Sequence, residues 1–311
     1  MKPFYIVGPT ASGKSAAALA LAEITGGEIV NADAFQLYQG MDLLTAKPSR
    51  VDRARAPHHL YDVLPMTESC DAQRYREMAL PVIEDIERRG KLAIVVGGSG
   101  LDVKALSHGL AAVPRGSPRV RARLAHLSLG EKANWLLQRD PKAAETVALR
   151  NPRYVERALE ICLLTGLPQS ELRQSFAETR PQGQGVVLQW EREGLYARIN
   201  QRVLDMLAAG LREEVRALSK GGLTAEKAIG LLEIRAHLKG ELPLAAAVAA
   251  MQLATRHYAK RQGTWFKREQ WLQTICLDSE ATAECILAKI LALFPCLLPP
   301  HPPKRSRSLS T

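Results

Sequence analysis

The sequence predicts an α/β fold, in which a parallel sheet is flanked by helices and an all-helical domain is inserted into the core. Short apolar runs alternate with helical stretches near both ends of the chain, and strands in that order pair in parallel through crossover connections. The pattern changes between residues 114 and 182, where basic helical segments follow one another with almost no strand signal. At 311 residues the chain is long enough for both parts.

The first part of the predicted core, residues 1–113, opens with a strand and a helix. Phe4–Val7 is a β-prone run that ends at a glycine, and residues 15–24 are rich in Ala and Leu. Residues 28–31 predict a second buried strand, and residues 92–96 are a further apolar run that predicts a third. Ligands of such sheets bind at the carboxyl ends of the strands, so the residues that follow these runs are candidates for a site.

The inserted block, residues 114–182, contains 12 basic and 7 acidic residues and so holds half of the formal net charge of +10. Asn151 and Pro152 predict the start of a helix, because Asn is a good cap and Pro suits the first helical position. Gly166 predicts the end of that helix. We therefore expect a basic helical domain here.

The second part of the core is predicted at residues 183–294. Residues 186–190 have strand character, and residues 196–219 and 244–261 have a helical pattern. Residues 295–311 combine prolines, basic residues and serines, a composition typical of disorder.

The overall charge favours a polyanionic partner, since 42 Lys and Arg residues outnumber 32 Asp and Glu residues and the isoelectric point is near 9.5. The five cysteines include no CxxC pair, which indicates a reduced, cytoplasmic protein. The apolar run at the N-terminus is too short for a secretory signal, and Lys289 and Pro295 interrupt the late apolar stretch, which is too short to span a membrane. We expect a cytoplasmic monomer with no membrane partner.

Residues 8–15 read GPTASGKS and match the P-loop pattern between a strand and a helix. In such a loop, backbone N–H groups and the helix N-terminus surround a di- or triphosphate, the lysine neutralises it and the final hydroxyl can reach Mg²⁺. The pattern does not say whether the phosphates belong to a nucleotide. The predicted phosphate site consists of Gly8, Pro9, Thr10, Ala11, Ser12, Gly13, Lys14 and Ser15.

An acidic residue is expected near this loop, because in common P-loop NTPases a second strand ends in an Asp that helps hold Mg²⁺. Residues 92–96 are followed by Gly97 and Gly98 and not by an acid. Asp33, which follows the strand at residues 28–31, is the candidate: it would face the same crevice as Lys14 and could accept a proton or assist Mg²⁺. A turn or helix cap is the alternative role for Asp33.

Residues 260–268 interleave cations with Trp265 and Phe266, as expected of a surface that follows phosphates and stacks bases. A helix end with a solvated basic face and an aromatic core anchor explains the same residues equally well. Arg153 and Arg157 each have a Glu three residues further on, so an ordinary solvated helix face accounts for them too.

Longer motifs add a family resemblance. The segments that carry it are IVGPTASGKS (6–15), NADAFQLYQGMDLLTAKP (31–48), PHHLYDV (57–63), VGGSGLDVKAL (96–106), NPRYVERALEI (151–161), RINQRVLDML (198–207) and TRHYAKRQGTWFKR (255–268). In this order they resemble the bacterial tRNA dimethylallyltransferases, the IPP transferase family. The resemblance covers most of the chain and ends near residue 293.

The resemblance implies a P-loop-type core whose inserted helices grip the tRNA anticodon stem. It implies transfer of a dimethylallyl group from dimethylallyl diphosphate to the exocyclic amine of the adenosine beside the anticodon, position 37, with release of diphosphate. The P-loop would hold that diphosphate together with Mg²⁺ at Ser15, in place of ATP. Lys14 and Arg202 would neutralise the leaving group, Asp33 would be the general base, and Ser99 would lie beside the site.

The resemblance also implies which residues contact tRNA, including a base flipped out of its stack. They are Asp33, Ala34, Phe35, Gln36, Ser99, Arg121, Arg153, Tyr154, Val155, Glu156, Arg157, Lys227, Gly230, Lys260, Arg261, Gln262, Trp265 and Lys267.

The sequence departs from the family pattern at several positions. Ser99 stands where the family usually has Thr, and it keeps the hydroxyl. Asp102 and Leu231 each replace an expected Tyr, and residues 43–44 replace an Ile-Gly pair. We expect weaker packing or RNA contact there, and Asp102 adds a negative charge near the phosphate channel. None of these changes removes Lys14, Asp33 or Arg202.

Three other functions stay open at this point. A P-loop kinase requires only the GPTASGKS motif. An adenylate isopentenyltransferase has a similar loop and chemistry but acts on free nucleotide and needs no basic helical insertion. A noncatalytic RNA-binding protein with a vestigial P-loop would use the basic surfaces alone.

Overall fold

The computed structural model describes residues 2–110, 113–172, 180–279 and 281–298. The chain forms two compact units: His108–Arg180 is one, and the residues before and after it form the other. We describe each unit by itself.

The larger unit is built on a six-stranded sheet in which every neighbouring pair is parallel, in the order β3-β2-β4-β1-β5-β6. The predicted parallel α/β sheet is thus confirmed. The four strands expected from the sequence form its centre, and β3 and β6 are short strands at its edges that were not predicted. The strands are β1 (Phe4–Val7), β2 (Glu28–Asn31), β3 (His58–His59), β4 (Ala93–Gly97), β5 (Gln184–Trp190) and β6 (Gln273–Leu277).

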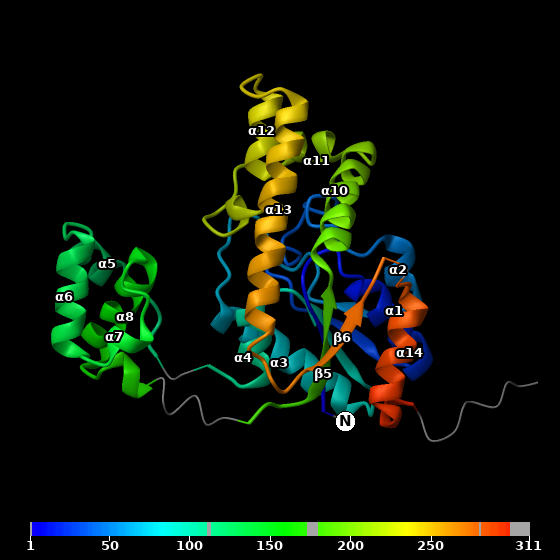
Figure 1. The fold of residues 1–311 in the computed structure, drawn as a ribbon, viewed down its shortest axis with the longest axis horizontal. Helices are drawn as coiled ribbons and strands as arrows, with labels where there is room; N and C mark the ends of the chain where they lie inside the picture. The colour runs from blue at the N-terminus through cyan, green and yellow to red at the C-terminus, as the bar shows by residue number, and fades with distance from the viewer. Residues whose placement is uncertain (1, 111–112, 173–179, 280, 299–311) are drawn as a thin grey trace, which may run out of the picture. The chain divides into compact units, whose positions relative to one another are not determined.

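Both faces of the sheet are buried, which is why β1 and β4 are apolar along their whole length. Along β1, Tyr5 and Val7 belong to one core cluster, together with α3 (Ala72–Arg88) and α4 (Gly100–Ser107). Phe4 and Ile6 point to the opposite face and pack in the cluster that includes α1 (Lys14–Thr25) and α14 (Ala283–Leu293). Figure 1 shows α1 and α14 on one side of the sheet and α3 and α4 on the other.

The helices between β5 and β6 form a group at the carboxyl end of the sheet (Figure 1). The helix expected over residues 196–219 is instead two helices, separated at Gly210, whose φ of 102° is unfavourable for residues with a side chain. α13 continues to Phe266, five residues beyond the expected end. The helices in this group are α10 (Arg192–Ala208), α11 (Leu211–Ala217), α12 (Leu231–Leu238) and α13 (Leu244–Phe266), and the remaining short elements of the larger unit are α2 (Arg50–Arg55) and the 3₁₀ turns η1 (Ala225–Lys227) and η2 (Pro295–Leu297).

The smaller unit is all-helical in the described residues and has its own apolar core. Asn151 accepts a hydrogen bond from the N–H of Arg153 and caps the longest helix, Pro152 takes its first position, and Gly166 ends it in the left-handed conformation, as predicted. The helices are α5 (Pro118–Leu124), α6 (Leu129–Arg139), α7 (Ala143–Thr146) and α8 (Pro152–Thr165).

The expected disorder from residue 295 is wrong at its first residues, because Pro295–Leu297 form η2 and Leu297 is buried in the core of the larger unit. The rest of that expectation, residues 299–311, lies outside the described part of the chain. None of the described helices has both the length and the apolar character that crossing a membrane requires.

Candidate active site

Three loops meet at the carboxyl edge of the sheet, because β2, β4 and β1 are neighbours. The P-loop follows β1, the turn with Asp33 follows β2, and Ser99 follows β4. This is the edge where ligands of parallel sheets bind. The structure thus brings Lys14, Asp33 and Ser99 together as the sequence predicted.

The P-loop has a backbone that few sequences can adopt. Gly8 has φ 146°, and a Cβ there would lie 2.7 Å from the carbonyl oxygen of Leu188 on β5. Ala11 has a positive φ of 63°, which is strained for a residue with a side chain. Gly13, with φ 88°, is the N-cap of α1, so the loop leads directly into the N-terminus of that helix. Backbone N–H groups at such a terminus attract anions.

Two side chains hold the P-loop from outside. Arg198 donates from Nε to the carbonyl oxygen of Ala11 at 2.9 Å, and Trp190 donates from Nε1 to the carbonyl oxygen of Ser12 at 3.1 Å. The Arg198 guanidinium also lies 4.5 Å from the centre of the Trp190 ring. Both bonds use carbonyl oxygens of the loop and none of its N–H groups.

Two cations lie close to the Asp33 carboxylate. Burial lowers the pKa of Lys14 to about 7; the charge of Asp33 raises it in part, and Arg202 lowers it further. Burial also lowers the pKa of Arg202, with the same opposing effect from Asp33. Lys14 donates to the carbonyl oxygen of Pro9 at 2.6 Å. Partly desolvated cations such as these gain most from a polyanionic ligand.

Asp33 is fixed by its neighbours in the chain. Its N–H donates to Oδ1 of Asn31, and its own Oδ1 accepts the N–H of Phe35, both at 3.0 Å. The N–H of Ala34 donates to Oγ of Ser99 at 2.9 Å. Asp33 therefore also has the alternative role of a turn residue. Oδ1 performs that role, and Oδ2 can accept a proton.

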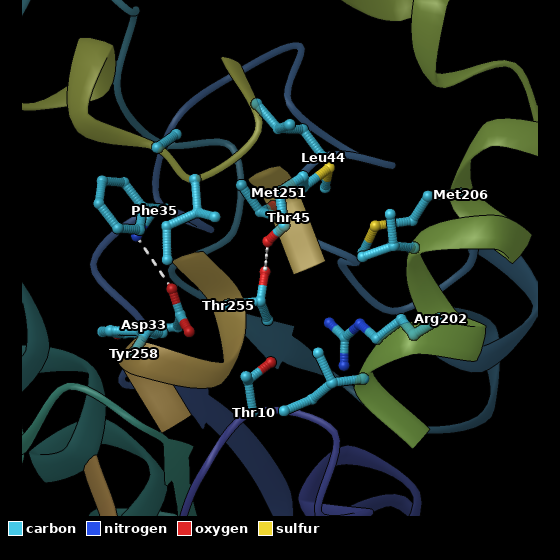
Figure 2. Close-up of a pocket in the computed structure, with 14 residues that line it drawn as sticks. Thr10, Asp33, Phe35, Leu44, Thr45, Arg202, Met206, Met251, Thr255 and Tyr258 are labelled. Atoms are coloured by element: carbon cyan, nitrogen blue, oxygen red, sulfur yellow. Dashed lines mark hydrogen bonds between the residues drawn. The ribbon is translucent and has the colours of Figure 1, made fainter. Parts of the chain in front are cut away.

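A pocket opens above these residues (Figure 2). Asp33 and Thr10 lie at its polar end, and Arg202 reaches into it from α10. Apolar side chains from several elements form the rest of the wall: Phe35, Leu44, Ile199, Val203, Met206, Ala228, Ile229 and Met251. A polar end beside an apolar wall suits a ligand with an anionic head and a short hydrocarbon chain.

The contribution of α13 to this pocket was not predicted from the sequence. Met251, Thr255 and Tyr258 line it and are spaced by four and three residues, which places them on one helix face. The spacing is present in the sequence, but the strongly basic composition around it favoured an RNA-binding surface over a pocket wall.

Gln262, expected to contact tRNA, is instead 4% exposed and lies between two loops of the site. Its Oε1 accepts the N–H of Thr10 at 2.8 Å, and its Nε2 donates to the carbonyl oxygen of Gly98 at 2.9 Å. A Cβ at Gly98 would overlap this amide, and one at Gly100 would overlap the Trp265 indole. The glycines after β4 thus allow α13 to approach closely.

The other residues expected to contact tRNA in the larger unit fall into two groups. Gln36 is buried and donates to the carbonyl oxygens of Thr45 and Ala46, so its amide supports the neighbouring loop. Gly230 is buried at the start of α12. The exposed ones are Lys227, Lys260, Arg261, Trp265 and Lys267.

In the smaller unit, Arg121 and Arg157 both bind Glu160, which is 1% exposed. Val155 is fully buried in the core of this unit, whereas Tyr154 is 58% exposed and Arg153 is exposed. The predicted pairing within the helix holds for Arg157.

The pairing predicted for Arg153 and Glu156 is not the one observed, because Glu156 binds Lys132 of α6. A partner on another helix is a contact that spacing along α8 could not reveal.

The described residues contain no group of three His, Cys, Asp or Glu side chains that could hold a metal by itself. Ser15 is exposed at the first turn of α1, next to Lys14. Mg²⁺ keeps several waters and is commonly bound through one or two protein oxygens and the phosphates of a substrate. The donors at this site fit that kind of Mg²⁺ binding.

Comparison with known proteins gives the family. A family model described as IPP transferase matches residues 36–269. The chain is 44% identical over 299 residues to a tRNA dimethylallyltransferase of Geobacter metallireducens, covering 93% of this chain and 96% of the relative. It is 41% identical over 287 residues to a tRNA dimethylallyltransferase of Akkermansia muciniphila, covering 92% and 97%.

Solved structures agree. The full-length tRNA isopentenylpyrophosphate transferase of Bacillus halodurans is 32% identical, with a TM-score of 0.69 and 96% of each chain covered. A eukaryotic dimethylallyltransferase solved while acting on tRNA is 27% identical, with a TM-score of 0.77 over 89% of this chain and 74% of that one. Both the sequence and the fold therefore match over most of the length, and the chain belongs to the IPP transferase family.

Proposed function

We propose that this protein transfers a dimethylallyl group from dimethylallyl diphosphate to the exocyclic amine of the adenosine beside the tRNA anticodon, position 37. The observation that carries the proposal is the pocket that joins Asp33 and Arg202 to an apolar wall at the edge of the P-loop. The names of the relatives point to the same reaction.

The P-loop would bind the diphosphate of the donor. Its N–H groups and the N-terminus of α1 would surround the phosphates, and Lys14 and Arg202 would balance their charge. The bond between the allylic carbon and the diphosphate oxygen breaks in the reaction, and the oxygen keeps the electron pair. Fixed cations favour that step because they stabilise the charge that develops on the leaving group.

The apolar wall would hold the five-carbon chain. Val203, Met206 and Met251 belong to helices that pack together, so this part of the wall is built on the scaffold and not on a loop. Burial of the chain also keeps water away from the reactive allylic carbon.

Asp33 would accept the proton of the attacking amine. As the bond between the amine nitrogen and the allylic carbon forms, Oδ2 of Asp33 takes the proton that the nitrogen loses. An aromatic amine is a weak nucleophile, so holding it in line with the allylic carbon contributes as much as proton removal. The adenosine must leave its stack to reach this depth.

Mg²⁺ would bind at Ser15 and the donor diphosphate. When bound, it would supply positive charge to the leaving group. The residues of this chain would position the donor and acceptor with or without it.

The basic surfaces would bind tRNA. Lys260 and Arg261 lie exposed on α13, and Trp265 is 37% exposed beside them, a combination suited to phosphates and unstacked bases. Arg153 and Tyr154 offer similar groups in the smaller unit. A cytoplasmic, monomeric enzyme agrees with this role.

The test is transfer of radiolabel from dimethylallyl diphosphate, with Mg²⁺, to unmodified tRNA, scored as acid-precipitable counts. Asp33→Asn is the matched control, since its amide oxygen still accepts the Phe35 N–H but cannot take the proton. Label in wild-type reactions only would support the proposal. Label in free AMP alone, ATP turnover without transfer, or tRNA binding without any transfer would each replace it with one of the other functions considered above.

A further inference from the structure

The loop that follows Met41 forms one end of the candidate pocket. Leu44 and Thr45 of this loop line the pocket, and Figure 2 shows Leu44 at the end opposite to Thr10. Leu44 is 5% exposed and stands where the family resemblance leads one to expect Gly. A Leu side chain fills space that Gly would leave open, so it makes this end of the pocket more closed.

The Leu44 side chain meets Met251 of α13 at the start of α12. A Cβ at Gly230 would lie 3.0 Å from Cδ1 of Leu44 and 2.7 Å from Cε of Met251. The absence of a side chain at Gly230 therefore leaves room for the other two side chains. Leu44 and Met251 together form what we call the end wall of the pocket.

Glu214 of α11 holds the backbone of the loop that carries Leu44. Its Oε2 accepts the N–H of Leu43 at 2.7 Å, and its Oε1 accepts the N–H of Leu44 at 2.8 Å. Hydrogen bonds to a carboxylate are stronger than those between neutral groups, and two from adjacent N–H groups also fix orientation. On the other side of Leu44, Gln36 donates to the carbonyl oxygen of Thr45 at 2.9 Å. The backbone is thus held on both sides of Leu44.

The helix that carries Glu214 is itself anchored in the core. Leu211 and Val215 of α11 are buried in the same apolar cluster as Leu44. Glu214 lies three residues after Leu211 and one before Val215, which places it on the same side of the helix. The carboxylate therefore holds the loop from a support that is fixed by packing.

We propose, on the basis of the proposed function, that Glu214 is a positioning residue for the donor: it keeps Leu44 in the end wall and so makes the protein select a five-carbon donor over a longer one. The diphosphate would bind at the P-loop, at the opposite end of the pocket. The space between the P-loop and Leu44 then limits the length of the hydrocarbon chain. A longer chain must displace Leu44, and the two hydrogen bonds to Glu214 oppose that movement.

The experiment measures prenyl transfer to unmodified tRNA, at saturating tRNA, from dimethylallyl diphosphate and from the ten-carbon geranyl diphosphate, with inorganic diphosphate as a competing inhibitor. The amide of Glu214→Gln has one acceptor oxygen, so one N–H of the loop loses its partner. We expect KM for dimethylallyl diphosphate to rise about four- to fifteenfold, the equivalent of one or two buried CH₂ groups. The kcat and the Ki for inorganic diphosphate should not change, because the P-loop and Asp33 are not altered. Relative kcat/KM for the ten-carbon donor should increase.

Glu213→Gln is the matched control. It is the same chemical change at the next residue of α11, where an exposed carboxylate lies 3.8 Å from Arg216 of the same helix. We expect this variant to keep the KM, the Ki and the donor preference of the wild type. If Glu214→Gln does not fold, Glu214→Asp takes its place, because it keeps the charge but shortens the reach of the carboxylate to the loop.

Leu44→Ala tests the end wall without changing the hydrogen bonds to Glu214, which use only the backbone. This variant should accept geranyl diphosphate at least as well as Glu214→Gln does. An unchanged preference for the five-carbon donor in Leu44→Ala would overturn the inference.

The ratio of the two constants distinguishes positioning of the donor from a general loosening of the site. Equal rises in KM for dimethylallyl diphosphate and in Ki for inorganic diphosphate, or no rise in either, would overturn the role of Glu214 and leave the prenyl transfer intact. A wild type that transfers no label to tRNA from either donor would overturn the proposed function and, with it, this inference.

Discussion

At the scale of single residues, Asp33 has two tasks that its two oxygens divide. Oδ1 holds the turn by accepting the Phe35 N–H, and Oδ2 is the atom proposed to take the proton. The sequence allowed either role but could not show that both occur together. Two substitutions separate them.

We expect Asp33→Ala and Asp33→Asn to lower kcat by about 10² to 10⁴, the range of a general base, with little loss of tRNA affinity. Asn keeps the turn, so similar losses in both variants would assign the effect to proton removal. Single-turnover rates and tRNA filter binding measure the two quantities. If Asp33→Asn retained most of the rate, the role of Asp33 would be confined to the turn.

A second residue prediction concerns Lys14. Its pKa of about 7 means that the free side chain is neutral above that pH, whereas a bound diphosphate favours the charged form. Binding must then take up a proton, and the Kd for inorganic diphosphate should increase with pH above 7, by up to about tenfold per unit.

Titration calorimetry in buffers of different ionisation enthalpy measures both the affinity and the proton uptake. Lys14→Gln should bind diphosphate more weakly and lack the proton uptake of this side chain. The uptake that remains in this variant comes from titration of the ligand itself and can be subtracted. Equal proton uptake by the wild type and Lys14→Gln would contradict the assignment of this uptake to Lys14.

At the scale of elements, α13 is joined to the sheet through Gln262. Removing its amide leaves the Thr10 N–H and the Gly98 carbonyl without their partner, so Gln262→Ala should lower the free energy of unfolding by about 2 to 4 kcal/mol. Denaturant titration measures this. Thr264→Ala is the control on the same helix, because Thr264 is exposed and bonds only within α13.

Gly98→Ala tests the same contact from the other side. The new Cβ overlaps the Gln262 amide, so the substitution should cost less in the Gln262→Ala background than in the wild type. Additive effects of the two changes would show that the close approach is not what requires glycine.

The elements that were predicted from the sequence and those that were not differ in where their stability comes from. β1, α1 and the cap at Asn151 depend on neighbours in the chain, so local patterns predicted them. β3 has two residues and β6 lies at the sheet edge, and each is a strand only through its pairing with distant residues. Gln262 was misplaced for the same reason: composition showed a basic segment but not which of its faces meets the P-loop.

At the scale of the whole molecule, we expect the cations of the predicted RNA surface, and not the net charge alone, to set how strongly tRNA binds. Replacing Lys260 and Arg261 by Gln should weaken tRNA binding and reduce the slope of log K against log salt by about 0.7 to 0.9 for each phosphate that these side chains neutralise. The control replaces Arg88 and Lys239, which are also exposed cations but lie outside the predicted RNA surface.

Affinity measured at several salt concentrations distinguishes the two double variants. If both reduced the slope equally, only the total charge would matter. An unchanged slope in the Lys260 and Arg261 variant would show that these side chains do not bind phosphates.

The contacts of α13 also fix the number of residues between Thr255 and Gln262. Thr255 faces the pocket and Gln262 faces the P-loop seven residues later, close to two full turns at about 100° per residue. Inserting one residue between them would rotate the pocket wall by about 100° from the P-loop contact. Substitutions of the solvent-facing residues in this segment are therefore tolerable, whereas insertions and deletions are not. Homologous enzymes should vary here in composition but not in length.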